Sequence, residues 1–122
     1  MKSLSKSFII FGLALVLSGC GQKHKAKSVI VSFIEENTTL ADMNRSFDRL
    51  DSTYRLTDSI IVSMQQQARQ LPQLKKNVSF GKRPKGEALL YQRVKFCNES
   101  DTIRMTFYMD RAMTNVVACK EN

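Results

Sequence analysis

The chain contains a single histidine, His24, among its 122 residues. Catalysis by a Ser-His-Asp or Cys-His set needs a histidine base beside the nucleophile, and a histidine-based metal site needs several imidazoles. His24 lies in a short polar stretch, residues 20–25, that we expect to be a tether outside the folded domain. The five glycines do not cluster into a phosphate-binding loop, and Gly81 and Gly86 are typical of hairpin bends. We therefore expect neither a catalytic set of residues, nor a cofactor, nor a metal.

Cysteine is almost as scarce, with Cys20, Cys97 and Cys119 as the only three. The spacing of the last two fits neither a zinc knuckle nor a C-x-x-C redox pair. Aspartates are the remaining candidates for general bases, namely Asp48 with Asp51, or Asp58 alone. Acidic residues at turns and helix starts more often cap backbone N–H groups, and this is the role that we expect for them.

Long apolar runs are also missing, apart from one stretch of about ten residues, 8–17, which is too short to cross a bilayer as a helix. Lys2 and Lys6 precede it, as in the positively charged start of a signal peptide. The residues Leu17, Ser18, Gly19 and Cys20 follow at once. This segment resembles the leader and lipobox of bacterial lipoproteins, whereas a plain secretory signal or an N-terminal anchor helix is the alternative.

The lipoprotein resemblance implies cleavage between Gly19 and Cys20 and attachment of a diacylglyceryl group to the Cys20 thiol. Residues 1–19 are then a signal peptide, 20–25 a lipidated tether, and 26–122 one small domain. Removal of 19 of the 122 residues leaves 103, which is enough for a single core. Gly21 is not the aspartate that favours inner-membrane retention in some bacteria, so the outer membrane is favoured over the inner one.

Two segments have the apolar spacing of amphipathic helices. In 26–37 the apolar positions are Val29, Ile30, Phe33 and Ile34. In 58–70, which Thr57 caps, they are Ile60, Ile61, Met64 and Ala68. Residues 47–54 fit neither the helical nor the strand period well, and we expect a short irregular strand there.

Beyond Pro72 the chain is rich in strand formers, and we expect strands at 77–80, 88–97, 102–110 and 115–120. With turns centred on 98–101 and 111–114, Phe96 faces Ile103 and Val94 faces Met105. Further along, Gln92 faces Phe107 and Leu90 faces Met109. In the second hairpin Met109 faces Val116 and Phe107 faces Ala118. This register gathers the large apolar side chains on one face, and a slip of one residue would turn that face to solvent.

The same register places both domain cysteines on the polar face, with Cys97 opposite Thr102 and Cys119 opposite Thr106. They would then lie roughly 16 Å apart on the two strands that flank the middle one. A disulfide needs Cα atoms within about 7 Å of each other, so we expect two free thiols.

The expected fold class is α+β, with two helices packed on a curled antiparallel sheet of three to five strands. The order helix, short strand, helix, sheet resembles the nuclear-transport-factor-2-like and cystatin-like folds of small bacterial lipoproteins. In the first of these folds the helices and sheet enclose a pocket, which is an enzyme site in some members and a plain binding cavity in others.

Positive charge is the one surface feature that suggests a function. The leader takes Lys2 and Lys6 with it, which reduces the 19 basic residues to 17 against 11 acidic ones and leaves a net charge of about +6. We predict an anion-binding face, with a solvated basic surface as the alternative; its members are Lys82, Arg83, Lys85, Arg93, Lys95 and Arg104.

We thus expect a lipid-anchored envelope protein whose domain binds an anionic envelope component or another envelope protein. Nucleic acid is not an expected partner because of this location. A small-pocket hydrolase or isomerase of the same fold is the alternative.

Overall fold

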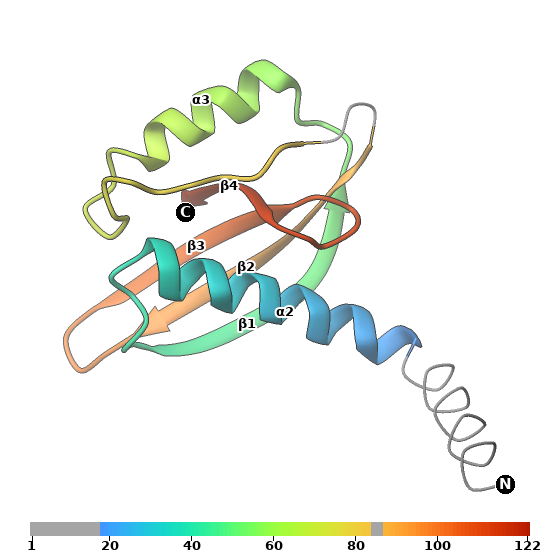
Figure 1. Ribbon diagram of the computed structural model, residues 1–122. Coiled ribbons are helices and arrows are strands. Elements are labelled where there is room, and N and C mark those ends of the chain that lie inside the picture. The colour runs from blue at the N-terminus through green and yellow to red at the C-terminus, as the bar shows by residue number, and fades with distance from the viewer. Residues whose placement is uncertain (1–17, 84–86) are drawn as a thin grey trace, which may run out of the picture.

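The computed structural model describes residues 18–83 and 87–122, with side chains from residue 21 onward (Figure 1). The elements follow one another as α2 (Ser18–Asn37), β1 (Asn44–Thr53), α3 (Asp58–Ala68), β2 (Leu89–Cys97), β3 (Thr102–Met109) and β4 (Val116–Glu121). The four strands form one antiparallel sheet in the order β1-β2-β3-β4. The predicted α+β class, with two helices and an antiparallel sheet, is confirmed.

The pairing of β2 with β3 has the predicted register throughout. Phe96 faces Ile103, and Lys95 faces Arg104. A short turn closes this hairpin, in which the Asn98 side chain accepts hydrogen bonds from the backbone N–H groups of Ser100 and Asp101, at 3.0 and 2.7 Å. The turn fixes which residues lie opposite each other, and strand alternation then sends the apolar set to one face.

The pairing of β3 with β4 differs from the prediction by one residue. Met109 faces Val116 as expected, but the register shifts beyond that pair, so that Phe107 faces Cys119 and not Ala118. Val117 is the extra residue, and a bulge of this kind reverses the direction of every side chain beyond it. Cys119 therefore lies buried opposite Phe107, and its predicted place on the polar face opposite Thr106 is wrong.

Helix α2 lies across the apolar face of the sheet. Ala26, Ile30, Phe33 and Ile34 are its buried residues, at spacings that put them on one side of a helix, and they belong to the main core cluster. The helix is longer than predicted, because residues 20–25 continue it instead of forming an irregular segment. Residues 22–25 are exposed, so this first part of α2 lies outside the core.

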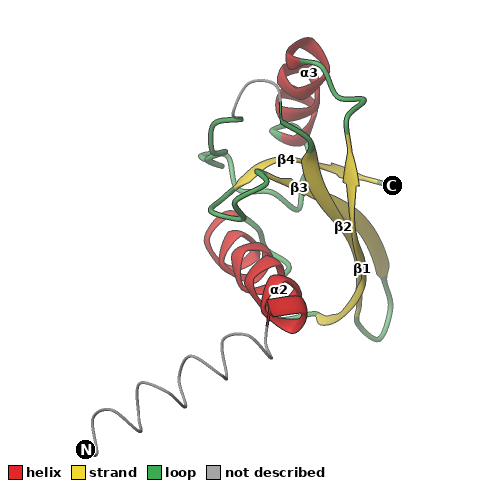
Figure 2. Cartoon of the chain, turned by 90° about the vertical axis from the view of Figure 1, so that its right-hand side faces the viewer, coloured by secondary structure: helices red, strands yellow, loops and turns green. Residues whose placement is uncertain are grey.

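Helix α3 packs along β4, away from α2 (Figure 2). The Thr57 hydroxyl accepts a hydrogen bond from the Ile60 N–H at 3.3 Å, which confirms the predicted cap. Ile61 packs with Tyr108 and Val117 in a second apolar cluster. Since Phe107 belongs to the main core and Tyr108 to this cluster, and adjacent strand residues point to opposite faces, α3 covers part of the second face of the sheet.

Two strand predictions need correction. Strand β1 begins earlier than expected, at Asn44, and carries an irregularity between Phe47 and Leu50. Residues 77–80 are not a strand, because this segment is held by a turn, with the Val78 N–H bonded to the Lys75 carbonyl at 3.2 Å, and by burial of Val78 in the core.

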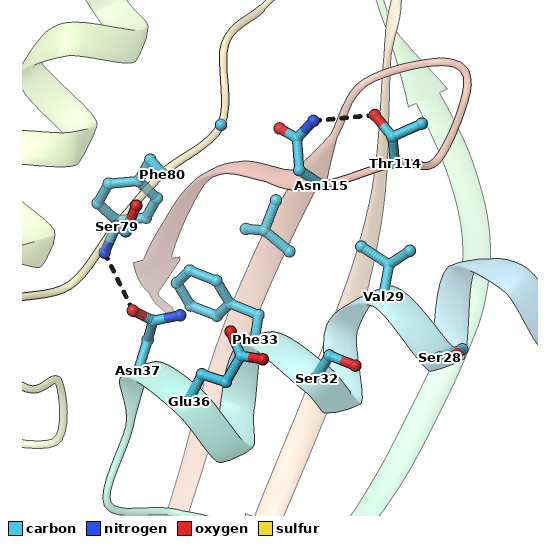
Figure 3. Close-up of a pocket in the computed structure, with 12 residues that line it drawn as sticks. Ser28, Val29, Ser32, Phe33, Glu36, Asn37, Ser79, Phe80, Thr114 and Asn115 are labelled. Carbon is cyan, nitrogen blue, oxygen red and sulfur yellow. Dashed lines mark hydrogen bonds between the residues drawn. The ribbon is translucent and has the colours of Figure 1, made fainter.

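The loop that contains residues 79–81, the turn 114–116 and helix α2 surround a groove of about 460 Å³ (Figure 3). It is the largest of the described depressions, and it lies on the α2 side of the sheet.

Candidate functional site

Three basic side chains share the part of the sheet face that α3 leaves uncovered. Arg93 and Lys95 alternate with buried residues along β2, and Arg104 projects from β3 in the same way. Lys95 lies directly opposite Arg104, as predicted. Side chains in such a cross-strand pair have Cβ atoms about 5 Å apart, and like charges at that distance repel each other. Arg93, Lys95 and Arg104 are called the basic face below.

The basic face borders a shallow depression of about 270 Å³. Its lining residues are Ser46, Phe47, Asp48, Arg93, Val94, Lys95, Arg104 and Asn122. Asn122 is held there by its N–H, which donates to the Arg104 carbonyl at 2.8 Å, and by its Oδ1, which accepts from the buried Thr106 hydroxyl at 2.8 Å. Ser46 lies opposite Lys95 on the neighbouring strand β1. Sequence reasoning missed Ser46 and Asn122 because it gave β1 no register and ended the last strand too early.

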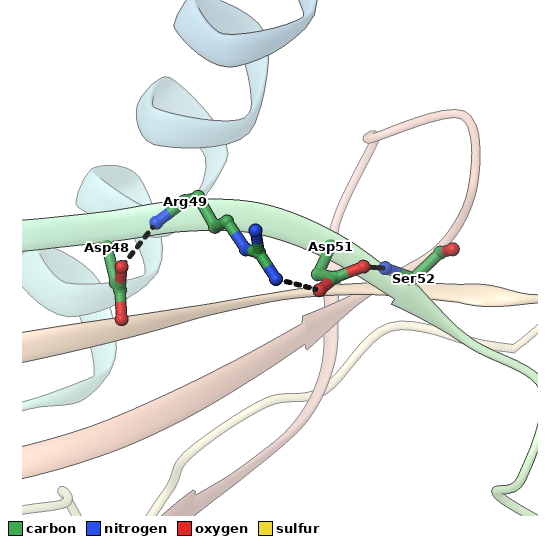
Figure 4. A network of polar contacts seen from close by, with 4 residues as sticks. All are labelled: Asp48, Arg49, Asp51 and Ser52. Atoms are coloured by element: carbon green, nitrogen blue, oxygen red, sulfur yellow. Dashed lines mark hydrogen bonds and ion pairs between the residues drawn. The ribbon is translucent and has the colours of Figure 1, made fainter.

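Acidic side chains near the depression are turned to backbone groups. Asp48 is the only acidic residue among the described residues of the lining, and its carboxylate accepts a hydrogen bond from the Arg49 N–H at 2.8 Å (Figure 4). The Asp51 carboxylate accepts a hydrogen bond from the Ser52 N–H at 2.9 Å. Arg49 pairs with Asp51 at 3.6 Å. Within the described part of the chain, no member of the basic face forms an ion pair. Among the described side chains that line the depression, three are cationic and one is anionic, and this balance favours an anionic ligand.

Arg93 is positioned by an aromatic neighbour. Its guanidinium lies over the Tyr91 ring, 5.7 Å from the centroid, and Tyr91 packs against Tyr108 at 5.8 Å between centroids. Burial, followed by the neighbouring Tyr91, raises the pKa of the Tyr108 hydroxyl, while Arg93 acts in the opposite direction. Arg93 is therefore anchored at one edge of the second apolar cluster.

Of the predicted anion-binding residues in the loop before β2, Arg83 has a partner outside the basic face. Lys82 is exposed in that loop. The guanidinium of Arg83 donates to the Asp58 carboxylate at 3.2 Å, and its side chain is only 14% exposed, so Arg83 ties the loop to the start of α3. Lys85 lies outside the described residues. For Gly19 and Cys20, the predicted cleavage and lipidation residues, the structure describes only the backbone.

Asp110 has the most deeply buried of the described carboxylates, and its hydrogen bonds stabilise a turn. Burial alone would raise the pKa of Asp110, but hydrogen bonds from the Thr114 hydroxyl and from the N–H groups of Asn115 and Thr114 outweigh it and lower the pKa below its ordinary value. The Asp110 carboxylate thus organises the turn between β3 and β4, in which Met113 has a positive φ of 56°.

Cys97 and Cys119 are the two cysteines whose side chains the structure describes, and Cys119 is the buried one. Burial raises the pKa of the Cys119 thiol to about 12, so this sulfur stays protonated. Cys97 and Cys119 are both free. Across residues 18–83 and 87–122, no three His, Cys, Asp or Glu side chains come close enough together to hold a metal ion.

Comparison with protein-family models, with curated proteins and with solved structures gives no match for this chain. Any functional assignment therefore rests on the residues themselves.

Proposed function

We propose that the protein is a lipid-anchored protein of the bacterial envelope, with a small non-catalytic domain that binds an anionic envelope component through its basic face. The anchor is proposed from the lipobox that ends at Cys20 and from the apolar run before it. Two or more acyl chains hold a protein stably on a membrane, whereas a single chain binds marginally. Within the described residues, no helix is long and apolar enough to cross a membrane.

The distance between the proposed anchor and the core is short. Ala26, fully buried in the core cluster, comes six residues after Cys20, and the intervening residues are helical. Six helical residues span about 9 Å. A lipid on Cys20 would thus hold the domain close to the headgroups. Gly21 in place of aspartate leaves the outer membrane as the favoured location.

The observation that supports anion binding is the Lys95–Arg104 pair. The two cations lie directly opposite each other on an uncovered sheet face, with Arg93 nearby and without a carboxylate partner among the described side chains. A phosphate, carboxylate or sulfate group placed between them would turn a repulsive arrangement into an attractive one. Candidate partners are therefore lipid headgroups, acidic glycans or an acidic surface of another envelope protein.

A binding domain is favoured over a small-pocket enzyme because the space directly between α2 and the sheet is filled by core side chains, whereas the groove of about 460 Å³ lies at the edge of this core, between α2 and two loops. Phe33 and Phe107 meet edge to face at 5.9 Å between centroids, Phe96 and Phe107 at 6.4 Å, and all three are buried. On the strength of element order, we also propose a likeness to the nuclear-transport-factor-2-like and cystatin-like folds, in a form whose interior is closed.

Charge reversal tests the basic face. An unlipidated protein that starts at residue 20 with Cys20→Ala would carry Arg93→Glu, Lys95→Glu and Arg104→Glu. The matched control would carry Arg55→Glu, Lys76→Glu and Arg111→Glu, three exposed positions away from the depression. Both variants change the net charge equally, so a difference between them reports position and not total charge.

Retention on anionic vesicles and on an acidic polysaccharide is the measurement. Exposed charge pairs contribute about 0.2–1 kcal/mol each, so reversal of three of them should weaken binding by about tenfold or more. Added salt should weaken the wild-type protein in the same way. Equal retention of the two reversed variants would show that the basic face is only a solvated surface.

A further inference from the structure

We propose that the groove between α2 and the loops at 79–81 and 114–116 is a second binding site, and that its ligand is an uncharged glycan segment. The groove encloses about 460 Å³, which lies in the range of small-ligand sites (Figure 3). It lies on the α2 side of the sheet and shares no lining residue with the basic face. A ligand in this groove would require neither the proposed lipid anchor nor anion binding at the basic face.

One wall of the groove is a polar stripe along α2. Ser28, Ser32 and Glu36 follow one another at intervals of four residues, which places them in a row on one side of a helix. They extend over about 12 Å. All three are exposed, and in the described part of the chain none of their side chains has a recorded hydrogen bond to protein. The row therefore offers two hydroxyls and one carboxylate to a ligand.

The opposite wall carries the Asn115 carboxamide, which has unused hydrogen-bonding capacity. The Asn115 Nδ2 donates to the Thr114 hydroxyl at 2.9 Å, while the Asn115 Oδ1 is buried without a partner. A Cβ at Gly81 would lie 1.4 Å from that oxygen, so the lack of a side chain at Gly81 is what makes room for the carboxamide. A ligand hydroxyl that draws the carboxamide toward the groove would supply the missing donor.

Asn37 adds a donor at the end of the row. Its Oδ1 accepts a hydrogen bond from the Ser79 N–H at 3.0 Å, and this bond fixes the carboxamide with its Nδ2 free to donate. Figure 3 shows Asn37 and Glu36 together at this end of the groove. The groove thus offers both donors and acceptors, which sugar hydroxyls can use.

The floor is apolar, with Val29, Phe33, Phe80 and Val116 beneath the polar walls. Phe80 stacks on Phe33 at 5.6 Å between centroids, and the Arg69 guanidinium lies over the Phe80 ring at 5.3 Å. These contacts fix the Phe80 side chain. A sugar ring presents C–H groups to such a floor while its hydroxyls reach the walls.

The charge of the groove selects among ligand classes. Among the described residues that line the groove, Glu36 is the only charged one, so an anionic ligand would be repelled there and would go instead to the basic face. A purely apolar ligand would cover the serine hydroxyls and leave them without partners, which is costly. A cationic ligand would find a single exposed carboxylate. A neutral polyhydroxyl ligand uses both walls and the floor.

Saturation-transfer NMR on the full-length protein tests this proposal, in micelles of a detergent without a sugar headgroup. The probes are cellobiose, maltose and N,N′-diacetylchitobiose. We expect saturation transfer to at least one of them. Ser32→Leu, which fills the groove, should reduce the affinity of the protein for that disaccharide about tenfold. Glu36→Gln should reduce the same affinity several-fold through loss of a charged acceptor. The neighbouring exposed Glu35→Gln, which does not line the groove, should leave it unchanged.

Ser32→Leu is suited to this test because position 32 is exposed on a helix and leucine is the better helix former. Ser28→Leu is the second groove-filling variant, and circular dichroism confirms the fold of both. The absence of transfer to all three disaccharides would overturn the proposal, and so would transfer that survives both filling variants. Binding of a trilysine peptide that depends on Glu36, with no sugar binding, would also overturn it in favour of a cationic ligand.

Discussion

The like-charge pair on the basic face predicts that one substitution raises the stability of the domain. Arg104→Glu converts the Lys95–Arg104 pair from repulsive to attractive without touching the core, since Arg104 is exposed and its structural hydrogen bond uses only its backbone carbonyl. Cross-strand charge pairs contribute about 0.2–1 kcal/mol in either direction. The change from repulsion to attraction should raise the free energy of unfolding by about 0.4–2 kcal/mol. Solvent screening of the exposed charges places this increase near the lower end, at roughly 0.5–1 kcal/mol.

Thermal unfolding followed by circular dichroism at low ionic strength measures this change. For a domain of about 100 residues, 1 kcal/mol shifts the melting temperature by about 4–8 °C, so we expect Arg104→Glu to raise it by roughly 2–8 °C. Arg104→Gln, which removes the repulsion without adding attraction, should give about half of the gain. At high salt the differences should shrink, because exposed charges are screened.

The double variant Lys95→Glu with Arg104→Glu isolates the pair. It restores a like-charge contact, now between two carboxylates, and should lose the gain seen for Arg104→Glu alone. If Arg104→Glu leaves the melting temperature unchanged or lowers it, and if the double variant equals the sum of the single ones, then Lys95 and Arg104 do not interact. The electrostatic reasoning for the basic face would then fail.

Three further predictions concern other parts of the fold. Alkylation of the native protein should label Cys97, whereas Cys119, buried and with its pKa raised to about 12, should react only after unfolding; rapid native labelling of Cys119 would refute its place in the core. Because the pKa of Asp110 is lowered in the folded state, the ionised carboxylate stabilises the fold fully above about pH 5, and this stabilisation is lost as the pH falls through the lowered pKa. Asp110→Asn should therefore flatten the acid limb of the curve of unfolding free energy against pH, and an unchanged acid limb would contradict this. Replacement of Asp48 and Asp51 by Ala should free N–H groups on the edge strand β1 and promote self-association in sedimentation experiments, and a variant that stays as monomeric as wild type would show that these contacts do not protect the edge.

The parts of the fold that local rules determine were predictable from the sequence. The β2–β3 register follows from a short turn between two alternating strands, and the start of α3 follows from the Thr57 cap. The bulge at Val117 was not predictable. Because α3 packs on the second side of the sheet, both faces of β4 are covered, so the predicted register and the observed one each place apolar β4 residues on a covered face. The predicted strand at 77–80 failed because its two apolar side chains, Val78 and Phe80, although strand formers, pack into the core from a loop.

The candidate site was predictable only in part, for a related reason. Alternation along β2 and β3 was enough to place Arg93, Lys95 and Arg104 on one face. Arg83 was grouped with them because it is near in sequence and charge, but its partner Asp58 lies 25 residues away, and no local pattern indicates that contact. The groove is likewise formed by segments far apart in the sequence.

Fractionation of Cys20→Ala tests the central claim, the lipid anchor, most directly. We predict that the wild-type protein sediments with membranes, resists carbonate extraction and carries acyl chains on an N-terminal peptide that begins at Cys20. The variant should lose the membrane attachment and keep the circular dichroism spectrum of a folded domain, because the core begins at Ala26. A Cys20→Ala protein that still sediments with membranes after carbonate treatment would contradict the lipoprotein assignment.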